Sequence, residues 1–359
     1  MTLTAPPLIA QVLDDLAGRE SAPVGPLASR LVTDGAEVVV IGSVESNRQH
    51  GFTIDPRIRF VPLDPAQRKP PVGGAWLLRA IRDVRLATAG ADLVHAHGRL
   101  AGLLASAGIG KRVPLVVSWY RWMAEGQARY GPVPRLVARR ADVNCAGSWA
   151  GLQRLRAWGA SDARLVPPAR PSDPGDPTGA TGLSEPTGPD TDVLRAALGA
   201  RRRPLVVLTA GSRRQAHQLV AELSMLLRPL TPRPVVIGPE DAWSATPAAD
   251  LLITVGETDT LLARRALAAG VPLVIAEQPA DSRDPAGTDA ELRTVAHDAA
   301  LYVSGETQAI ATAVERLLDD AVLARRLAVA ARRQAAGWPD EQDTIAQLVA
   351  IYRELLTAR

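Results

Sequence analysis

The stretch ADLLITVGETDTLLARRALAAGVPLVIAE, residues 249–277, contains the pattern on which our fold prediction rests. An apolar run at 250–255 ends in a small turn, and a helical pattern at 258–269 follows at once. A Gly-Val-Pro sequence then ends the helix and leads into a second apolar run at 272–276. Because both runs are apolar without interruption, they fit strands that are covered on both faces. The stretch therefore predicts a strand–helix–strand unit of a parallel sheet.

The same alternation of strands and helices extends over the rest of the chain. In the first half we expect strands at 8–13, 37–42, 58–62, 92–96, 114–118, 142–146 and 163–166, and helices at 25–34, 74–89, 99–109, 132–140 and 148–158. In the second half we expect further strands at 204–209, 234–238 and 301–303, and helices at 213–228, 287–298, 306–318 and 320–336. Such alternation is typical of βαβ units, so we predict an α/β protein with open sheets.

A segment rich in Pro, Gly, Ser and Asp, residues 167–190, interrupts this pattern and cannot build a core or hold a helix. We therefore predict an N-terminal domain over 1–168, a linker over 169–190 and a C-terminal domain over 191–338. Residues 339–359 contain an amphipathic helix, which we expect to pack back on the first domain. Two α/β domains joined in this way predict a cleft lined by the carboxyl ends of strands.

Composition narrows the classes of function. The 41 basic and 38 acidic residues nearly cancel, so we do not expect nucleic-acid binding. The single cysteine, Cys145, excludes an intramolecular disulfide, and its apolar neighbours predict a buried, inert thiol. No signal peptide is recognisable, and no apolar run approaches the ~20 residues of a membrane span. We expect a soluble cytoplasmic protein.

Four segments in this order resemble the retaining GT-B glycosyltransferases of the family 4-like group. They are GPLASRLVTDGAEVVVIG (25–42), ADLVHAHGRLAGLLA (91–105), ADVNCAGSWAGLQRLRAWGASDARLVPP (141–168) and the stretch at 249–277. The resemblance implies a GT-B fold, with two Rossmann-like domains that face a cleft. It also implies that a sugar passes from a nucleoside diphosphate sugar to a glycan, lipid-linked or small-molecule acceptor, without a bound metal or cofactor.

The resemblance also assigns roles to particular residues. The stretch at 249–277 corresponds to the segment of the family that binds the donor, here called the donor block. Gly256 and Glu257 form the turn before its helix, and Glu257 is expected to bind the donor sugar. Gly211, Arg213 and Arg214 follow the first strand of the C-terminal domain and are expected to hold the diphosphate, because a helix N-terminus with cations suits a phosphate. Tyr120 and His97 are expected to line the acceptor side. The alternatives are an ordinary βαβ crossover at Glu257 and a solvated surface pair of arginines.

Several positions depart from the family pattern. The donor block of the family has a second glutamate, and Arg265 stands there. Arginine has no acceptor atom, but Arg265 could instead pair with a phosphate of the donor or with another carboxylate. No lysine follows the arginine pair, and Tyr120 replaces a histidine near the reacting sugar. Only eleven residues separate the strand at 234–238 from Asp250, which shortens a region that contacts the nucleotide base in the family.

These departures keep two other functions open. The chain could be a catalytically silent homologue that acts as partner or regulator of an active glycosyltransferase. It could also be a different GT-B-like enzyme, such as a sugar-nucleotide epimerase.

Two further features suggest ligands. His95 and His97 lie two apart on a strand, as metal ligands can, but no third ligand cluster accompanies them and we predict no metal site. A second feature is a series of basic and aromatic residues that could dock on an anionic membrane surface, or could equally be a solvated face. Its members are Arg79, Arg82 and Arg85 in the helix at 74–89, then Trp119, Trp122, Met123 and Tyr130, and finally Arg135, Arg139 and Arg140.

Overall fold

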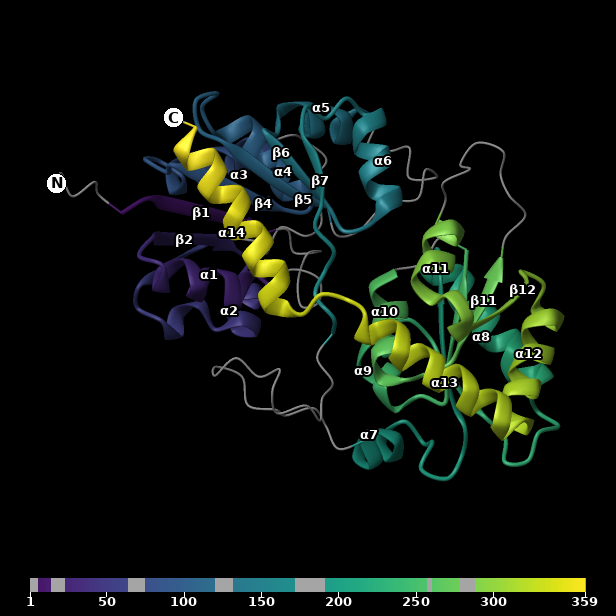
Figure 1. Ribbon diagram of the computed structural model, residues 1–359. Helices are drawn as coiled ribbons and strands as arrows, with labels where there is room; N and C mark the ends of the chain where they lie inside the picture. Colours follow the sequence, from purple (N-terminus) through teal and green to yellow (C-terminus); the bar gives the residue numbers. More distant parts are fainter. Residues whose placement is uncertain are drawn as a thin grey trace. The chain divides into compact units, whose positions relative to one another are not determined.

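The computed structural model describes residues 6–13, 23–63, 75–119, 132–171, 191–256, 260–277 and 288–358. Its internal contacts divide the chain into two units (Figure 1). Unit 1 comprises residues 1–169 together with 339–359, and unit 2 comprises residues 170–338. Residues 172–190, which make up most of the expected linker, lie outside the described residues.

Unit 1 contains a seven-stranded parallel sheet with the order β3-β2-β1-β4-β5-β6-β7. Its strands are β1 (Leu8–Leu13), β2 (Glu37–Gly42), β3 (Ile58–Pro62), β4 (Leu93–His97), β5 (Leu115–Trp119), β6 (Val143–Ala146) and β7 (Ala163–Leu165). The chain winds in one direction from β1 to β3 and in the other from β4 to β7. The direction of winding therefore switches between β1 and β4.

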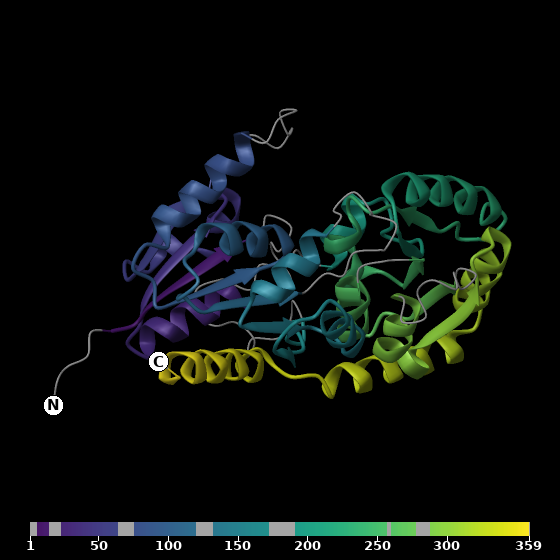
Figure 2. The same cartoon turned by 90° about the horizontal axis from the view of Figure 1, so that it is seen from above.

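Helices cover both faces of this sheet. They are α1 (Val24–Thr33), α2 (Val44–His50), the 3-10 helix η2 (Phe52–Ile54), α3 (Ala75–Ala87), α4 (Arg99–Gly108), α5 (Val133–Arg140), α6 (Trp149–Ala157) and α14 (Glu341–Thr357). One apolar core joins the sheet to α1 and α14 through residues such as Leu27 and Leu348, and the other joins it to α3–α6 through Val84 and Leu104. Figure 2 shows α14 and α3 on opposite sides of the strands. Two covered faces explain why the strands are continuously apolar.

Unit 2 contains a five-stranded parallel sheet with the order β12-β11-β10-β8-β9. Its strands are β8 (Leu205–Ala210), β9 (Val235–Ile237), β10 (Leu251–Val255), β11 (Leu273–Glu277) and β12 (Ala300–Ser304). Its helical segments are α7 (Thr191–Ala197), α8 (Arg213–Leu226), α9 (Ala242–Ala245), η4 (Thr246–Ala248), α10 (Thr260–Ala269), α11 (Thr288–Ala296), η5 (His297–Ala299), α12 (Thr307–Asp319) and α13 (Ala321–Ala336). Here the direction of winding switches between β8 and β10.

The structure confirms the α/β fold class. Every predicted strand is present, and the predicted helices begin and end within one or two residues of their expected bounds. Three short helices, α2, α7 and α9, were not predicted. Each is too short to show a helical period in the sequence.

A buried polar network connects α14 to the sheet of unit 1. The side chain of Tyr352 on α14 is 1% exposed, and its hydroxyl accepts a hydrogen bond of 3.1 Å from Nε2 of Gln11. The same hydroxyl bonds to Nδ1 of His95, whose Nε2 bonds to Oγ of Ser118 at 2.8 Å. Because buried polar groups are costly when they are unpaired, this network specifies where α14 packs.

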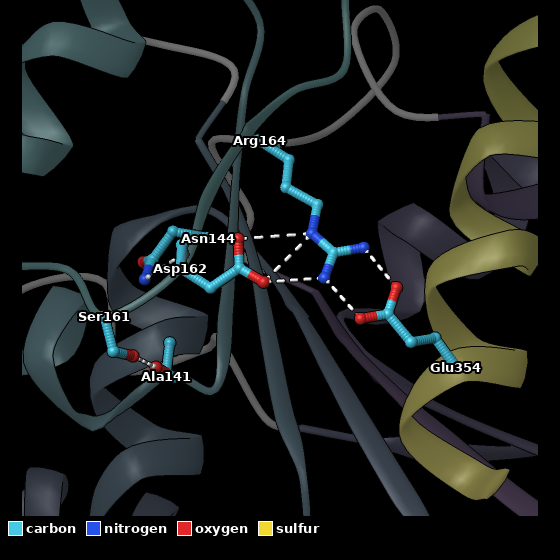
Figure 3. A network of polar contacts seen from close by, with 6 residues as sticks. All are labelled: Ala141, Asn144, Ser161, Asp162, Arg164 and Glu354. Carbon is cyan, nitrogen blue, oxygen red and sulfur yellow. Dashed lines mark hydrogen bonds and ion pairs between the residues drawn. The ribbon is translucent and has the colours of Figure 1, made fainter. Parts of the chain in front are cut away.

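A second contact of α14 lies nearer the surface (Figure 3). The guanidinium of Arg164 on β7 bonds to both carboxylate oxygens of Glu354, at 2.6 and 2.7 Å, and to Asp162 at 2.6 Å. This arrangement lowers the pKa of Glu354, chiefly through its hydrogen bonds with Arg164. A partly exposed pair adds little stability, but its two-pronged geometry fixes orientation.

Candidate functional site

The carboxyl edge of the sheet in unit 2 places two predicted site residues next to each other. Gly211 follows β8 and Gly256 follows β10, and these strands pair in parallel with Ala210 opposite Val255. The amide of Gly211 donates to the carbonyl of Val255 at 3.2 Å. Both glycines therefore lie at the switch point of the sheet, which is where open α/β sheets bind their ligands.

The first turn of α8 starts at the same edge. Ser212 has an extended backbone, and its Oγ accepts a hydrogen bond of 3.2 Å from the amide of Gln215. Arg213 and Arg214 occupy the first two positions of the helix, and both are exposed. The positive end of the helix dipole and two cations thus point to an anion at this edge.

The turn after β10 is left-handed at Gly256, with φ +64°. A residue with a Cβ atom would be strained in that conformation, so glycine suits the end of β10. Glu257, the predicted donor-binding carboxylate, lies outside the described residues, as does Tyr120.

Arg265 makes a contact that its sequence position did not suggest. Its guanidinium carbon lies 4.3 Å from the centre of the Trp243 ring, in the short helix α9. The preceding residue, Arg264, stacks in the same way on Trp338 at 3.9 Å, and burial lowers its pKa to about 10. Cation–π contacts therefore direct both arginines of α10 toward indole rings. A role for Arg265 in binding a nucleotide stays a prediction.

His97 ends β4 at the switch point of unit 1, but its side chain is fully buried. Its Nε2 bonds to Oε1 of Gln11 at 2.5 Å, and its ring centre lies 3.9 Å from that of His95. Burial lowers the pKa of His97 to about 3, so the imidazole is neutral near pH 7. Direct participation of His97 in catalysis stays a prediction.

Other residues of the sequence analysis have clear positions. Cys145 is buried as predicted, and burial raises the pKa of its thiol to about 12. The described residues contain no group of three or more His, Cys, Asp or Glu side chains placed to hold a metal ion. Among the helices that the structure describes, none has the length and hydropathy of a membrane span.

Two residues at the carboxyl edges were not singled out from the sequence. Glu240 follows β9 and contacts both Arg213 and His217. Trp149, in the first turn of α6 directly after β6, is 59% exposed. The sequence could have indicated both residues only through their turns. A Gly-Pro pair precedes Glu240 and a serine turn precedes Trp149, and both patterns are typical of loops at strand ends.

Residues 22–169 match the family model described as "Glycosyl transferase 4-like domain". The whole chain is similar in fold to sucrose-phosphate synthase from Thermosynechococcus elongatus, with a TM-score of 0.67, 17% identity and coverage of 98% of this chain and 100% of the other. It is also similar to Anabaena HepE in complex with UDP and glucose (TM-score 0.65, 16% identity, coverage 96% and 99%).

A third similar structure is a putative UDP-N-acetylglucosamine 2-epimerase from Listeria monocytogenes, with a TM-score of 0.63, 16% identity and coverage of 97% and 96%. No protein of curated function matches the sequence. The chain thus has the GT-B fold predicted from its sequence.

The buried histidines predict an acid-sensitive unit 1. The pKa values of His95 and His97 are lowered by burial, so the unfolded chain takes up their protons first as pH falls below about 6.5. Their contribution to stability is therefore complete above pH 6.5 and is lost as pH falls toward 3. For His97 alone, we expect a loss of about 2 kcal/mol between pH 7.5 and 5.

Urea unfolding at a series of pH values measures this effect. His97→Gln should flatten the dependence on pH between 7.5 and 5. Equal slopes in the wild type and His97→Gln would contradict the account of the buried histidines.

Proposed function

We propose that this protein is a glycosyltransferase that moves a sugar from a nucleoside diphosphate sugar to a glycan, lipid-linked or small-molecule acceptor, with retention of configuration. The observation that carries the proposal is the switch point of unit 2. There, Gly211 and Gly256 lie on adjacent strand ends beside the first turn of α8 and its two exposed arginines. The bound UDP and glucose of the similar Anabaena protein support the same class of donor.

The chemistry of transfer suits these groups. When the bond between the sugar and the diphosphate breaks, negative charge grows on the departing diphosphate. Arg213, Arg214 and the N-terminus of α8 would stabilise that charge, because cations and the positive end of a helix dipole attract a growing negative charge. Glu257 would accept hydrogen bonds from hydroxyls of the donor sugar. Tyr120 and His97 would belong to the acceptor side, where the buried imidazole of His97 would position neighbouring groups.

One contact favours a second candidate, a catalytically silent homologue that binds or regulates an active glycosyltransferase. Enzymes of the resembled family have a carboxylate at the position of Arg265. In this chain Arg265 stacks on Trp243 instead. An epimerase of sugar nucleotides is a third candidate, which the fold similarity to the Listeria protein supports. All three share the fold, so donor binding and turnover have to separate them.

Donor binding tests the proposal directly. A thermal-shift series with UDP-, GDP- and dTDP-sugars at millimolar concentration should raise the melting temperature with at least one donor. At a donor concentration of 100 Kd, the stabilisation should be about 2.7 kcal/mol. The double variant Arg213→Ala/Arg214→Ala should lose most of the shift, because it removes both cations from the first turn of α8.

A second pair of adjacent exposed arginines provides the matched control. Arg325 and Arg326 lie on α13, which packs against η5 at the amino end of β12. Arg325→Ala/Arg326→Ala should keep the full shift. Absence of a shift with every donor would contradict the glycosyltransferase and favour the silent homologue.

We further propose that unit 1 attaches peripherally to anionic membranes at the cytoplasmic face. On α3, Leu78 and Leu86 are 70% and 64% exposed, and Arg79, Arg82 and Arg85 are exposed beside them. On α5, Leu136 is 58% exposed next to the exposed Arg135. Exposed leucines among arginines favour a lipid surface over a merely solvated helix face, because the leucines gain from leaving water.

Co-sedimentation with vesicles of phosphatidylcholine and phosphatidylserine measures this attachment. Binding at low salt should fall as salt rises, and Arg79→Ala/Arg82→Ala should weaken it, since each basic residue near such a surface contributes about 1 kcal/mol. The control Arg325→Ala/Arg326→Ala, in unit 2, should bind like the wild type. The attachment would be refuted if the protein did not bind the vesicles at low salt, or if the binding did not change with salt concentration.

A further inference from the structure

Glu240 lies at the carboxyl edge of the sheet in unit 2, between β9 and α9. β9 is the neighbour of β8, so the end of β9 lies next to the end of the strand that leads into Gly211 and the first turn of α8. The proposed diphosphate site and Glu240 thus share one edge of one sheet. Glu240 lies outside both segments predicted to bind the donor, namely the donor block and the arginine pair.

Two side chains of α8 hold the carboxylate of Glu240. Nε2 of His217 bonds to Oε1 at 3.1 Å, and Nη1 of Arg213 lies 3.7 Å from the same oxygen. Both contacts are with Oε1, so neither occupies Oε2. A Cβ atom built on Gly238 would lie 3.5 Å from Oε2, which places this oxygen over the end of β9. Beyond these contacts and a hydrogen bond with its own backbone amide, the carboxylate still has a lone pair for another donor at the carboxyl edge.

The arginines of the predicted donor-binding segments cannot accept a hydrogen bond. Arg213 and Arg214 have no acceptor atom, and neither has Arg265. A nucleoside diphosphate brings more than phosphate oxygens to such a site, because its ribose carries hydroxyl groups that need acceptors. A carboxylate that is ionised and held in place is the strongest acceptor a protein can offer them. A hydrogen bond with its own backbone amide, together with His217 and Arg213, lowers the pKa of Glu240 and keeps it ionised.

We propose that Glu240 is the hydroxyl-binding carboxylate of the nucleotide site and that His217 and Arg213 hold it for that role. The inference rests on the proposed function and deepens it, since it assigns the sugar of the nucleoside to a residue outside the donor block. In this arrangement Arg213 bridges two anions, the diphosphate of the ligand and Glu240. The carboxylate that position 265 lacks is thereby supplied from the loop after β9.

An alternative role for Glu240 is to screen the charge of Arg213, and this role predicts the opposite change in ligand affinity when the carboxylate is removed. A screening carboxylate competes with the diphosphate, so its removal would tighten the binding of every phosphate ligand. A hydroxyl-binding carboxylate contributes only to the binding of ligands that contain a ribose. Its removal would therefore weaken the binding of nucleotides and leave the binding of pyrophosphate unchanged. The sign of the change in affinity for UDP therefore separates the two roles.

Isothermal titration of the full-length protein with UDP, 2′-deoxy-UDP, 3′-deoxy-UDP and inorganic pyrophosphate provides the test. Glu240→Gln keeps the shape of the side chain and removes its charge. It should weaken the binding of UDP by about tenfold, which is the usual cost of losing a hydrogen bond to a charged group. It should leave pyrophosphate unchanged or slightly tighter. The loss should vanish for the deoxy ligand that lacks the bound hydroxyl, as a double-mutant cycle requires.

Glu222→Gln provides the matched control, because Glu222 is a half-buried carboxylate on α8 that accepts hydrogen bonds from the side chains of Gln218 and Thr307. It should change none of the four affinities. UDP that binds equally well or more tightly to Glu240→Gln than to the wild type would overturn the inference. If the wild type itself binds neither UDP nor GDP nor dTDP, the proposed function fails, and the role of Glu240 fails with it.

Discussion

The parallel pairing of β8 with β10 is the constraint on which the candidate site depends. These strands are neighbours in the sheet although β9 lies between them in the chain. The connections after them therefore leave in opposite directions and open a space at their carboxyl ends. Gly211 and Gly256 place no side chains at this edge, so a ligand can approach the first turn of α8 closely. Each functional residue proposed in unit 2 acts through this edge.

Unit 1 depends on a contact between distant parts of the chain. Tyr352, near the C-terminus, completes a buried network with Gln11 on β1 and His95 on β4. The residues at 339–359 belong to unit 1 for this physical reason, together with the apolar face of α14. His97 lies in the same network, next to the switch point between β1 and β4. Its neutral, buried imidazole fits a structural role beneath the carboxyl edge of this sheet.

A feature could be predicted from the sequence when the residues that form it are close together along the chain. Continuous apolar strands and helical periods are local, so the strands and the long helices could be predicted to within one or two residues. The two-residue spacing of His95 and His97 correctly placed both rings on one face of the sheet. Tyr352, the partner of His95, could not be inferred, because it is 257 residues away from His95 in the sequence. The stacking of Arg265 on Trp243 and the contact of Glu240 with Arg213 likewise arise only when separate elements pack together.

A crystal structure of the full-length protein with UDP measures the central claim most directly. The account predicts that the diphosphate lies at the first turn of α8, within hydrogen-bonding distance of Arg213 or Arg214 and beside Gly211 and Gly256. Density for UDP at any other place, with this edge of unit 2 empty at saturating ligand, would contradict it.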